Sequence, residues 1–145
     1  MSVERHRPSG FEPGGLCWID LATTDTAAAG AFYAALLGWS TAERHAGRGR
    51  FITFARNGTA LASLYQLTRE QIAGGVPSHW MPYVAVPTAD TAAAKACALG
   101  GQLIVPPQDV ADFARICLIA DPTGAMMGLW QADRPCNGGR CSDAP

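Results

Sequence analysis

The sequence predicts an α+β fold of two tandem βαβββ modules, because a segment of the first half recurs in the second and both halves show the same order of strand and helix patterns. The motif Asp25-Thr-Ala-Ala-Ala29 recurs 65 residues later as Asp90-Thr-Ala-Ala-Ala94. The same offset aligns further pairs without a gap: Trp18 with Tyr83, Arg50 with Arg115, Leu64 with Leu129, Tyr65 with Trp130 and Gln66 with Gln131. A common offset in separated segments indicates that one supersecondary unit is duplicated.

The first module opens with the alternating residues of 16–23, which are typical of a strand. Asp25 is the predicted N-cap of a helix that runs to about Leu37, where Gly38 ends it. The stripe of this helix that we expect to be buried follows helical spacing and consists of Ala28, Ala31, Phe32, Ala35 and Leu36.

Three further strands complete the first module. We expect a strand at 39–45, a turn at 47–49, and a hairpin formed by 51–55 and 59–65. The dipeptide Asn57-Gly58 lies between the two hairpin strands and favours a tight two-residue turn.

The second module repeats this order. It is predicted to contain a strand at 80–86 and a helix at 89–99 that is capped by Asp90. A strand at 102–105 follows, and Pro106-Pro107 is expected to break it, because proline cannot donate to a strand ladder.

The last predicted feature of the second module is a hairpin of 115–120 and 125–131. The turn between these strands spans 121–124, and the Asp121 side chain is expected to bond backbone amides there. The predicted organisation is an N-terminal arm at 1–13, a first module at 14–67, a linker at 68–78 with one helical turn capped by Thr68, a second module at 79–132 and a C-terminal tail at 133–145.

Composition narrows the class of protein. The net charge is -1, from 11 Lys and Arg against 12 Asp and Glu, so a basic surface for nucleic acid is not indicated. Hydrophobic residues make up 48% of the chain and charged residues 16%, which favours a packed core over disorder. We find no apolar run of membrane-spanning length and no signal-peptide pattern, so the sequence predicts a cytoplasmic protein.

The five cysteines give little guidance. Cys17, Cys97 and Cys117 lie in apolar runs, where cysteine behaves as a small hydrophobe. Cys136 and Cys141 lie in the C-terminal tail, and a single C-x4-C pair lacks the further ligands that a zinc site needs. The tail is therefore expected to be functionally silent, with a disulfide or metal as the alternative.

Two sets of motifs resemble those of a known family. Phe32-Tyr33 is followed by Leu36-Leu37-Gly38-Trp39, and Asp121-Pro-Thr-Gly-Ala125 leads into the final strand. Over residues 15–131 the chain resembles the vicinal oxygen chelate superfamily, which includes glyoxalases, bleomycin-resistance proteins and extradiol dioxygenases. The stretch His79-Trp80-Met81-Pro82-Tyr83 looks like its glyoxalase-like branch.

The resemblance implies that the two modules form a cup-shaped, mostly antiparallel mixed sheet with helices outside. It also implies a homodimer and, in the enzymes, a divalent metal held by the first and last strands of each module. In this sequence those ligand positions fall on Trp18, on Met81 or Tyr83, on Ser63 and on Gly128. None of them is a histidine or a carboxylate, so we expect neither a metal nor another cofactor.

Strand alternation predicts what the cup contains. Turn lengths pair Phe54 with Leu61 and Arg50 with Tyr65 in the first hairpin, and Cys117 with Gly128 and Arg115 with Trp130 in the second. The predicted ligand-binding residues are Trp18, Arg50, Phe54, Leu61, Ser63, Tyr65, Met81, Tyr83, Arg115, Met126, Gly128 and Trp130. The small Ser63 and Gly128 are expected to leave room for a ligand, although a small cup can also fill with its own side chains.

The main functional hypothesis is a metal-independent protein that binds a small aromatic or hydrophobic molecule, in natural-product resistance or metabolism. The alternative is a lyase, isomerase or dioxygenase-type enzyme that uses His79 and Asp20 as acid and base or as unusual metal ligands. His79 could instead belong to the connection before its strand, and Arg115 could pair with Asp20 in a structural role. A module that only mediates protein interactions is the third possibility, and the sequence leaves open whether any reaction is catalysed.

Overall fold

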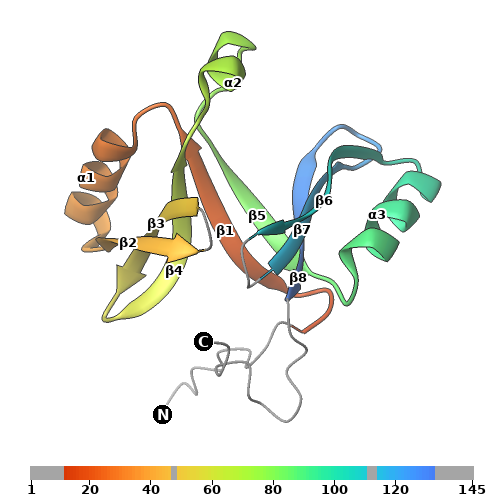
Figure 1. Cartoon of the computed structure of the whole chain (residues 1–145), viewed down its shortest axis with the longest axis horizontal. Helices are drawn as coiled ribbons and strands as arrows, with labels where there is room; N and C mark the ends of the chain where they lie inside the picture. The colour runs from red at the N-terminus through yellow and green to blue at the C-terminus, as the bar shows by residue number, and fades with distance from the viewer. Residues whose placement is uncertain (1–11, 47–48, 111–113, 133–145) are drawn as a thin grey trace. The chain divides into compact units, whose positions relative to one another are not determined.

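The computed structural model describes residues 12–46, 49–110 and 114–132. These residues form eight strands and three helices, which confirms the predicted α+β class. They divide into two compact units (Figure 1): a first unit, Trp18–Pro82, and a second unit made of the described parts of Met1–Cys17 and Tyr83–Pro145. Residues 47–48 of the predicted 47–49 turn, residues 1–11 of the predicted N-terminal arm, and the predicted C-terminal tail with its two cysteines lie outside the described residues.

The two units share one strand topology. The elements are β1 (Leu16–Thr23), α1 (Thr26–Leu37), β2 (Ser40–Ala46), β3 (Gly49–Arg56), β4 (Thr59–Gln66), α2 (Arg69–Ala73), β5 (His79–Ala85), α3 (Ala89–Ala98), β6 (Gln102–Val110), β7 (Ala114–Ala120) and β8 (Met126–Ala132). The strand order is β2-β3-β4-β1 for the first set and β5-β8-β7-β6 for the second, so each strand has a counterpart in the other set. The β1–β4 and β5–β8 pairs are parallel and the hairpins are antiparallel, which gives the predicted mixed sheet. The cup shape itself remains a prediction.

Helix α1 begins and ends as predicted, but it turns a different face to the sheet. The Asp25 side chain accepts a hydrogen bond from the Ala28 amide, and Gly38 ends the helix in the left-handed conformation. Ala29 and Tyr33 pack on the core, and Gly30 is buried between them. The stripe predicted to be buried (Ala28, Ala31, Phe32, Ala35 and Leu36) is exposed. This prediction is wrong because the helix is apolar on every face, so its spacing does not single out one stripe.

The core of the first unit lies between α1 and its strands. Its buried side chains are Leu21, Phe54, Ala62 and Leu64, and the partly buried residues around them include Ile19, Tyr33, Trp39, Ile52 and Trp80. Tyr33 is the hub of this packing, because its ring contacts those of Trp39, Phe54 and Trp80 and its hydroxyl accepts a hydrogen bond from Trp80 Nε1 at 3.1 Å.

The β3–β4 hairpin is built on the predicted turn, with Asn57 and Gly58 both at positive φ. A β-bulge between Phe54 and Ala55 then shifts the register by one residue. Phe54 therefore pairs with Ala62 and lies in the helix-facing core with an exposure of 0%, and its predicted pairing with Leu61 is wrong. A shift of one residue moves a side chain to the opposite face of the sheet.

The β7–β8 hairpin departs from prediction for a related reason. The loop holds five residues rather than four, because Ala120 pairs with Met126 and the Asp121 amide donates to the Ala125 carbonyl. Cys117 consequently pairs with Leu129, and Arg115 pairs with Gln131 rather than with Trp130. The predicted role of Asp121 is confirmed, since its carboxylate accepts hydrogen bonds from the amides of Thr123 and Ala125.

Two further predictions concern strand β6 and helix α2. Strand β6 continues through Pro106-Pro107, which were predicted to end it, because β6 stands at the end of the strand order and the ladder skips that position between Val105 and Gln108. The predicted turn capped by Thr68 is α2, which has a complete capping box with Gln71. In the described part of the chain no helix has the length and apolarity needed to cross a membrane.

Candidate functional site

The candidate site lies on the face of the first unit that α1 does not cover. In β1, Ile19 and Leu21 belong to the helix-facing core, so Trp18 and Asp20 point to the other side. In β4, Leu64 is in that core, which places Ser63 and Tyr65 on the same face as Trp18. We call the cluster of Trp18, Asp20, Ser63 and Tyr65 the polar–aromatic cluster.

Direct contacts and strand pairing hold this cluster together. The Trp18 indole Nε1 donates to Ser63 Oγ at 2.8 Å, and Asp20 stands opposite Ser63 in the parallel β1–β4 ladder. Leu61 is the extra residue of the β-bulge, between the paired Ala60 and Ala62, and it is half-buried. Trp18, Asp20 and Ser63 are half-buried. The hydrogen bond fixes the plane of the indole, so the cluster has a defined shape.

Tyr65 and Asp20 influence each other electrostatically. Burial raises the pKa of the Tyr65 phenol, and the negative charge of Asp20 raises it further. The phenol is therefore protonated at neutral pH and can donate a hydrogen bond, while a carboxylate such as Asp20 can accept one. Tyr65 remains 37% exposed, so its ring is accessible. The cluster thus offers two aromatic surfaces with an acceptor and a donor on one face.

The corresponding face of the second unit is filled by its own side chains. Tyr83 pairs with Gly128 across β5 and β8, and its ring occupies the place where a side chain at Gly128 would stand. The Tyr83 and Trp130 rings meet edge to face with centroids 5.7 Å apart, and both side chains are buried. Gly128 was predicted to leave room for a ligand, but the room that it provides is taken by Tyr83.

The pairing registers also show which residues of β1 and β5 are structurally equivalent. Ser63 and Gly128 are equivalent under the 65-residue offset, and they pair with Asp20 and Tyr83 respectively. Tyr83 is therefore the structural counterpart of Asp20, whereas the 65-residue repeat aligned Tyr83 with Trp18. By the same shift, Met81 is the counterpart of Trp18.

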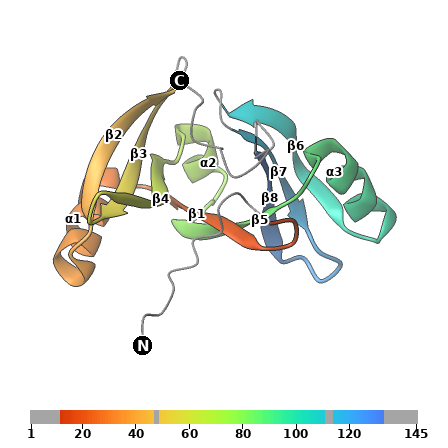
Figure 2. The same cartoon turned by 90° about the horizontal axis from the view of Figure 1, so that it is seen from below.

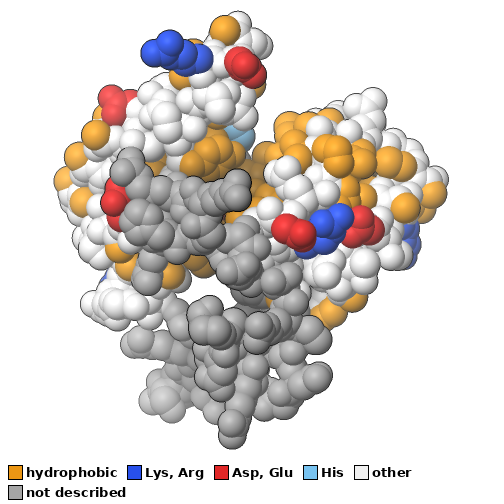
Figure 3. All heavy atoms as spheres, viewed as in Figure 1, with side chains coloured by type: hydrophobic (Ala, Val, Ile, Leu, Met, Phe, Trp, Pro, Cys, Tyr) orange, Lys and Arg blue, Asp and Glu red, His pale blue; other side chains and the backbone are white. Residues whose placement is uncertain are grey.

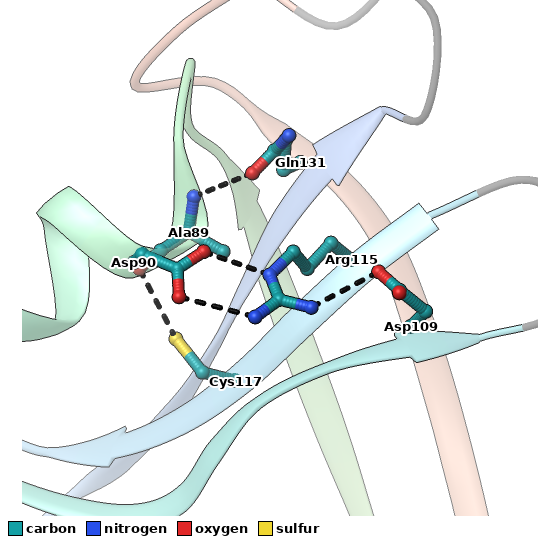
Figure 4. A network of polar contacts seen from close by, with 6 residues as sticks. All are labelled: Ala89, Asp90, Asp109, Arg115, Cys117 and Gln131. Carbon is teal, nitrogen blue, oxygen red and sulfur yellow. Dashed lines mark hydrogen bonds and ion pairs between the residues drawn. The ribbon is translucent and has the colours of Figure 1, made fainter.

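Arg115 was predicted to face the ligand, but it lies on the helix-facing side of β7 and binds the start of α3 (Figure 4). Its Nε and a terminal nitrogen donate to the two carboxylate oxygens of Asp90 at 2.7 and 3.1 Å, and its other terminal nitrogen donates to Asp109 at 3.1 Å. Arg115 lowers the pKa of the Asp90 carboxyl. The predicted capping role of Asp90 is wrong: Thr88 is the N-cap, and its side chain makes no capping bond.

The remaining predicted residues are spread over both units. Met81 is buried on β5, Met126 is 42% exposed at the start of β8, and the side chain of Arg50 lies outside the described residues. His79 is at the first position of β5, where its Nδ1 lies 2.8 Å from the Pro77 carbonyl oxygen. The sequence did not predict that Asp20 interacts with Tyr65, although Tyr65 was a predicted ligand-binding residue and Asp20 a predicted acid or base.

The donor atoms at the implied metal positions do not fit a divalent ion. The indole of Trp18 is a hydrogen-bond donor only, Ser63 is engaged by that indole, and Gly128 has no side chain. Met81 supplies only a soft thioether, which does not suit the harder divalent ions such as Mg²⁺, Ca²⁺ and Mn²⁺. Among the residues that the structure describes, no three His, Cys, Asp or Glu side chains lie close enough together to hold a metal.

Two of the described cysteines, Cys17 and Cys117, do not supply a reactive thiolate. Burial raises the pKa of the Cys17 thiol to about 11, and burial also raises that of Cys117. A thiol with so high a pKa is protonated at neutral pH, and Cys117 packs in the core beneath α3. Cys97 is exposed on the surface of α3.

Comparison with known proteins gives a family match and curated relatives. Residues 18–129 match the model of the glyoxalase-like domain. The chain is 38% identical over 128 residues to the Mycobacterium bovis protein "Putative glyoxylase CFP32", covering 87% of this chain and 49% of that protein. It is 33% identical over 135 residues to the anthracycline biosynthesis protein DnrV of Streptomyces peucetius, covering 83% and 48% respectively. The chain thus spans about half the length of these relatives.

Solved structures show the same fold at lower sequence identity. Methylmalonyl-CoA epimerase of Streptomyces coelicolor, in complex with 2-nitronate-propionyl-CoA, matches with a TM-score of 0.60 and 19% identity, covering 86% of this chain and 100% of that one. The epimerase of Mycobacterium tuberculosis matches with a TM-score of 0.61 and 19% identity, covering 90% and 95%. At this identity the likeness concerns the fold.

Proposed function

We propose, since this chain belongs to the family of glyoxalase-like domains, that it binds a small aromatic or hydrophobic organic molecule at the polar–aromatic cluster of its first unit. The observation that carries the proposal is the juxtaposition of Trp18 and Tyr65 with Asp20 and Ser63 on a face without a covering helix. Rings supply apolar contact area, and a few polar groups orient the ligand.

The polar groups indicate the chemistry of the ligand. The protonated Tyr65 phenol can donate to a keto or quinone oxygen, and the Asp20 carboxylate can accept from a phenolic or alcoholic hydroxyl. A planar ring system that carries both groups would use the cluster fully. Because a relative takes part in anthracycline biosynthesis, we propose an oxygenated polycyclic natural product as the ligand class.

The proposal includes binding without a metal and self-association as a homodimer. The donor set at the implied metal positions supports the first point, because Trp18 and Gly128 offer no lone pair to an ion. Orientation of the ligand would then depend on hydrogen bonds and ring contacts alone.

Titration with an anthracycline, followed by calorimetry and by quenching of tryptophan fluorescence, tests this function. Trp18→Ala and Tyr65→Ala are each expected to weaken binding by about tenfold, the equivalent of about 1.4 kcal/mol, because each removes one aromatic contact. Trp80→Phe is the matched control, since Trp80 packs on the helix-facing side of the same sheet and its loss should leave the affinity unchanged.

Two results would contradict the proposal. One is an affinity that neither Trp18→Ala nor Tyr65→Ala alters while both variants remain folded. The other is a loss of binding after dialysis against a chelator that is restored by a stoichiometric divalent ion, which would contradict metal independence in particular.

An enzyme is the second candidate, and the position of Asp20 beside Tyr65 favours it over a purely structural role. A carboxylate base and a protonated phenol on one face can together move a proton at a carbon next to a carbonyl group. In this version Tyr65 takes the acid role that was first assigned to His79. Asp20→Asn separates the candidates, since an enzyme would lose turnover while it still binds its ligand.

A further inference from the structure

We propose that the second unit holds a ligand site of its own beneath α3, a cavity that takes a single aromatic ring bearing a carboxylate. The cavity has a volume of about 300 Å³ and is partly open to solvent. Ala92, Ala96 and Leu99 line it from α3 and its C-terminal end, and Ile119 and Leu129 line it from β7 and β8. Figures 1 and 2 show α3 along β6 and β7, and Figure 3 shows apolar side chains at the right of the view, where Figure 1 places these elements.

Helices α1 and α3 hold equivalent places in the two units, and their burial patterns show which residues correspond. The residues that are not exposed are Thr26, Ala29, Gly30 and Tyr33 in α1, and Ala89, Ala92, Ala93 and Ala96 in α3. The two sets have the same spacing, and each begins at the first residue of its helix. Ala96 therefore stands where the first unit has Tyr33.

Aromatic rings fill the corresponding space in the first unit. Tyr33 stacks on Trp39 with ring centroids 5.9 Å apart and an interplanar angle of 26°. Trp39 directly precedes β2, and Gly101 directly precedes β6, which is the equivalent strand. Ala96 and Gly101 thus replace the two stacked rings in the second unit, and both line the cavity. The cavity is the space that those rings would occupy.

The walls of the cavity are held in place, so it does not close by collapse of α3. The Gly101 amide donates to the Ala96 carbonyl at 2.9 Å, and a Cβ atom at Gly101 would lie 2.8 Å from the Ala120 carbonyl oxygen. Leu129 and Ile119, on the strand side, belong to the core cluster beneath α3 and to the side chains packed against it. An engineered apolar cavity of about 150 Å³ takes up benzene. A cavity of about 300 Å³ has room for one substituted ring.

Charge indicates which substituent the ring carries. Lys95 is the cation of the lining, and no residue in the described part of the chain forms an ion pair with it. The carboxylate of Asp121, which also borders the cavity, already accepts hydrogen bonds from the amides of Thr123 and Ala125. Lys95 is exposed, so its ammonium group can meet a carboxylate at the open side while the ring packs against the alanines.

The size of the cavity separates this ligand from the one proposed for the polar–aromatic cluster. Ligand pockets typically range from about 300 to 1,000 Å³, and this cavity is at the lower end of that range. A polycyclic compound is too large for it, whereas a benzoate-type acid fits. The two sites lie in different units and can be tested independently.

Titration of the full chain with benzoate, followed by amide NMR shifts, tests the proposal. Saturable shifts are expected at Ala96, Leu99 and Ile119. Ala96→Phe is expected to weaken benzoate binding by at least about tenfold, because it returns a ring to the place that Tyr33 holds in the first unit. Ala94→Phe is the matched control: it makes the same change at an exposed position of α3 outside the lining, and the affinity should stay unchanged.

Lys95→Gln tests the role of the charge. It is expected to weaken benzoate binding by about threefold, the size of an exposed ion pair, and to leave the binding of the uncharged benzyl alcohol unchanged. Benzylamine, which has the same ring and the opposite charge, is expected to bind more weakly than benzoate. Equal affinities for benzoate and benzylamine would overturn the assignment of an acid.

Three further results would overturn the site itself. The first is the absence of saturable shifts around the cavity. The second is an unchanged affinity in Ala96→Phe, or in the smaller replacement Ala96→Leu should Ala96→Phe unfold. The third is a loss of benzoate binding in Trp18→Ala, which would assign the ligand to the polar–aromatic cluster. Anthracycline titration of Ala96→Phe keeps the two proposals apart, because this substitution does not touch that cluster.

Discussion

The two units share strand order and helix placement, but they use their helix-free faces differently. In the first unit, Ser63 and Asp20 pair across β1 and β4 and bring polar groups beside the Trp18 indole. In the second, Tyr83 and Gly128 hold the equivalent positions, and the tyrosine ring closes over the glycine. Duplication of a unit therefore preserves topology while single residues decide whether a face can receive a ligand or is filled by the protein itself.

The N-terminal ends of α1 and α3 also differ, although the sequence motif at these ends is repeated. Helix α1 is capped by the Asp25 side chain, as its sequence predicts. The repeat copies that aspartate as Asp90, but Asp90 lies inside the first turn of α3 and binds Arg115 instead. The start of α3 is tied to β8 as well, because the Ala89 amide donates to Gln131 at 2.8 Å (Figure 4). A repeated motif can thus retain its place in the chain and change its interaction.

The largest expected effect concerns the filled face of the second unit. Gly128→Ala is expected to lower the free energy of unfolding by about 1–3 kcal/mol, because a Cβ atom there would overlap the ring of Tyr83 and lie 2.8 Å from its Cγ. Tyr83 is 3% exposed, so its ring has little space into which to move. Urea unfolding measures the change.

The control for this substitution is another buried glycine with room around it. A Cβ atom at Gly30 would meet Thr41 Cγ2 at 3.5 Å, an ordinary contact, so Gly30→Ala is expected to stabilise the protein by about 0.5–1 kcal/mol through helix propensity. If Gly128→Ala were as stable as the unmodified chain, the face of the second unit would be open, and the contrast between the units would fail.

The second effect compares the two helix starts. Asp25→Ala is expected to cost about 1 kcal/mol of unfolding free energy, because it removes the capping bond to the Ala28 amide. Thr88→Ala at the corresponding end of α3 should change stability by less than about 0.5 kcal/mol, since its side chain makes no capping bond. Thermal or urea unfolding of both variants checks the pair, and equal losses would show that the two helices are capped alike.

The topology could be read from the sequence, whereas the facing of several side chains could not. The repeat, the Asn57-Gly58 turn and the glycine after α1 define strands and helices through local backbone preferences. The bulge after Phe54 and the fifth residue of the 121–125 loop are each a single-residue change in pairing. Because side chains alternate along a strand, those two shifts sent Phe54 and Arg115 to the helix-facing side. The alternation is plain at the core residues themselves: Ile19 and Leu21 mark the helix-facing side of β1 and Leu64 that of β4, so their neighbours fall on the opposite face. That this face binds a ligand stays a prediction.

The smallest expected effect tests the contact that distinguishes the first unit. Asp20→Asn removes the nearby negative charge, so the pKa of Tyr65 should fall, although it should stay above its usual value because burial is the larger cause of the shift. Titration of tyrosinate absorbance, with Tyr65→Phe to identify the signal, measures the change. Asp90→Asn in the second unit is the control and should leave the Tyr65 titration unaltered. A Tyr65 pKa that does not respond to Asp20→Asn would show that the Asp20 carboxylate and the Tyr65 phenol do not interact electrostatically. The first unit would then lack the paired acceptor and donor that set it apart from the second.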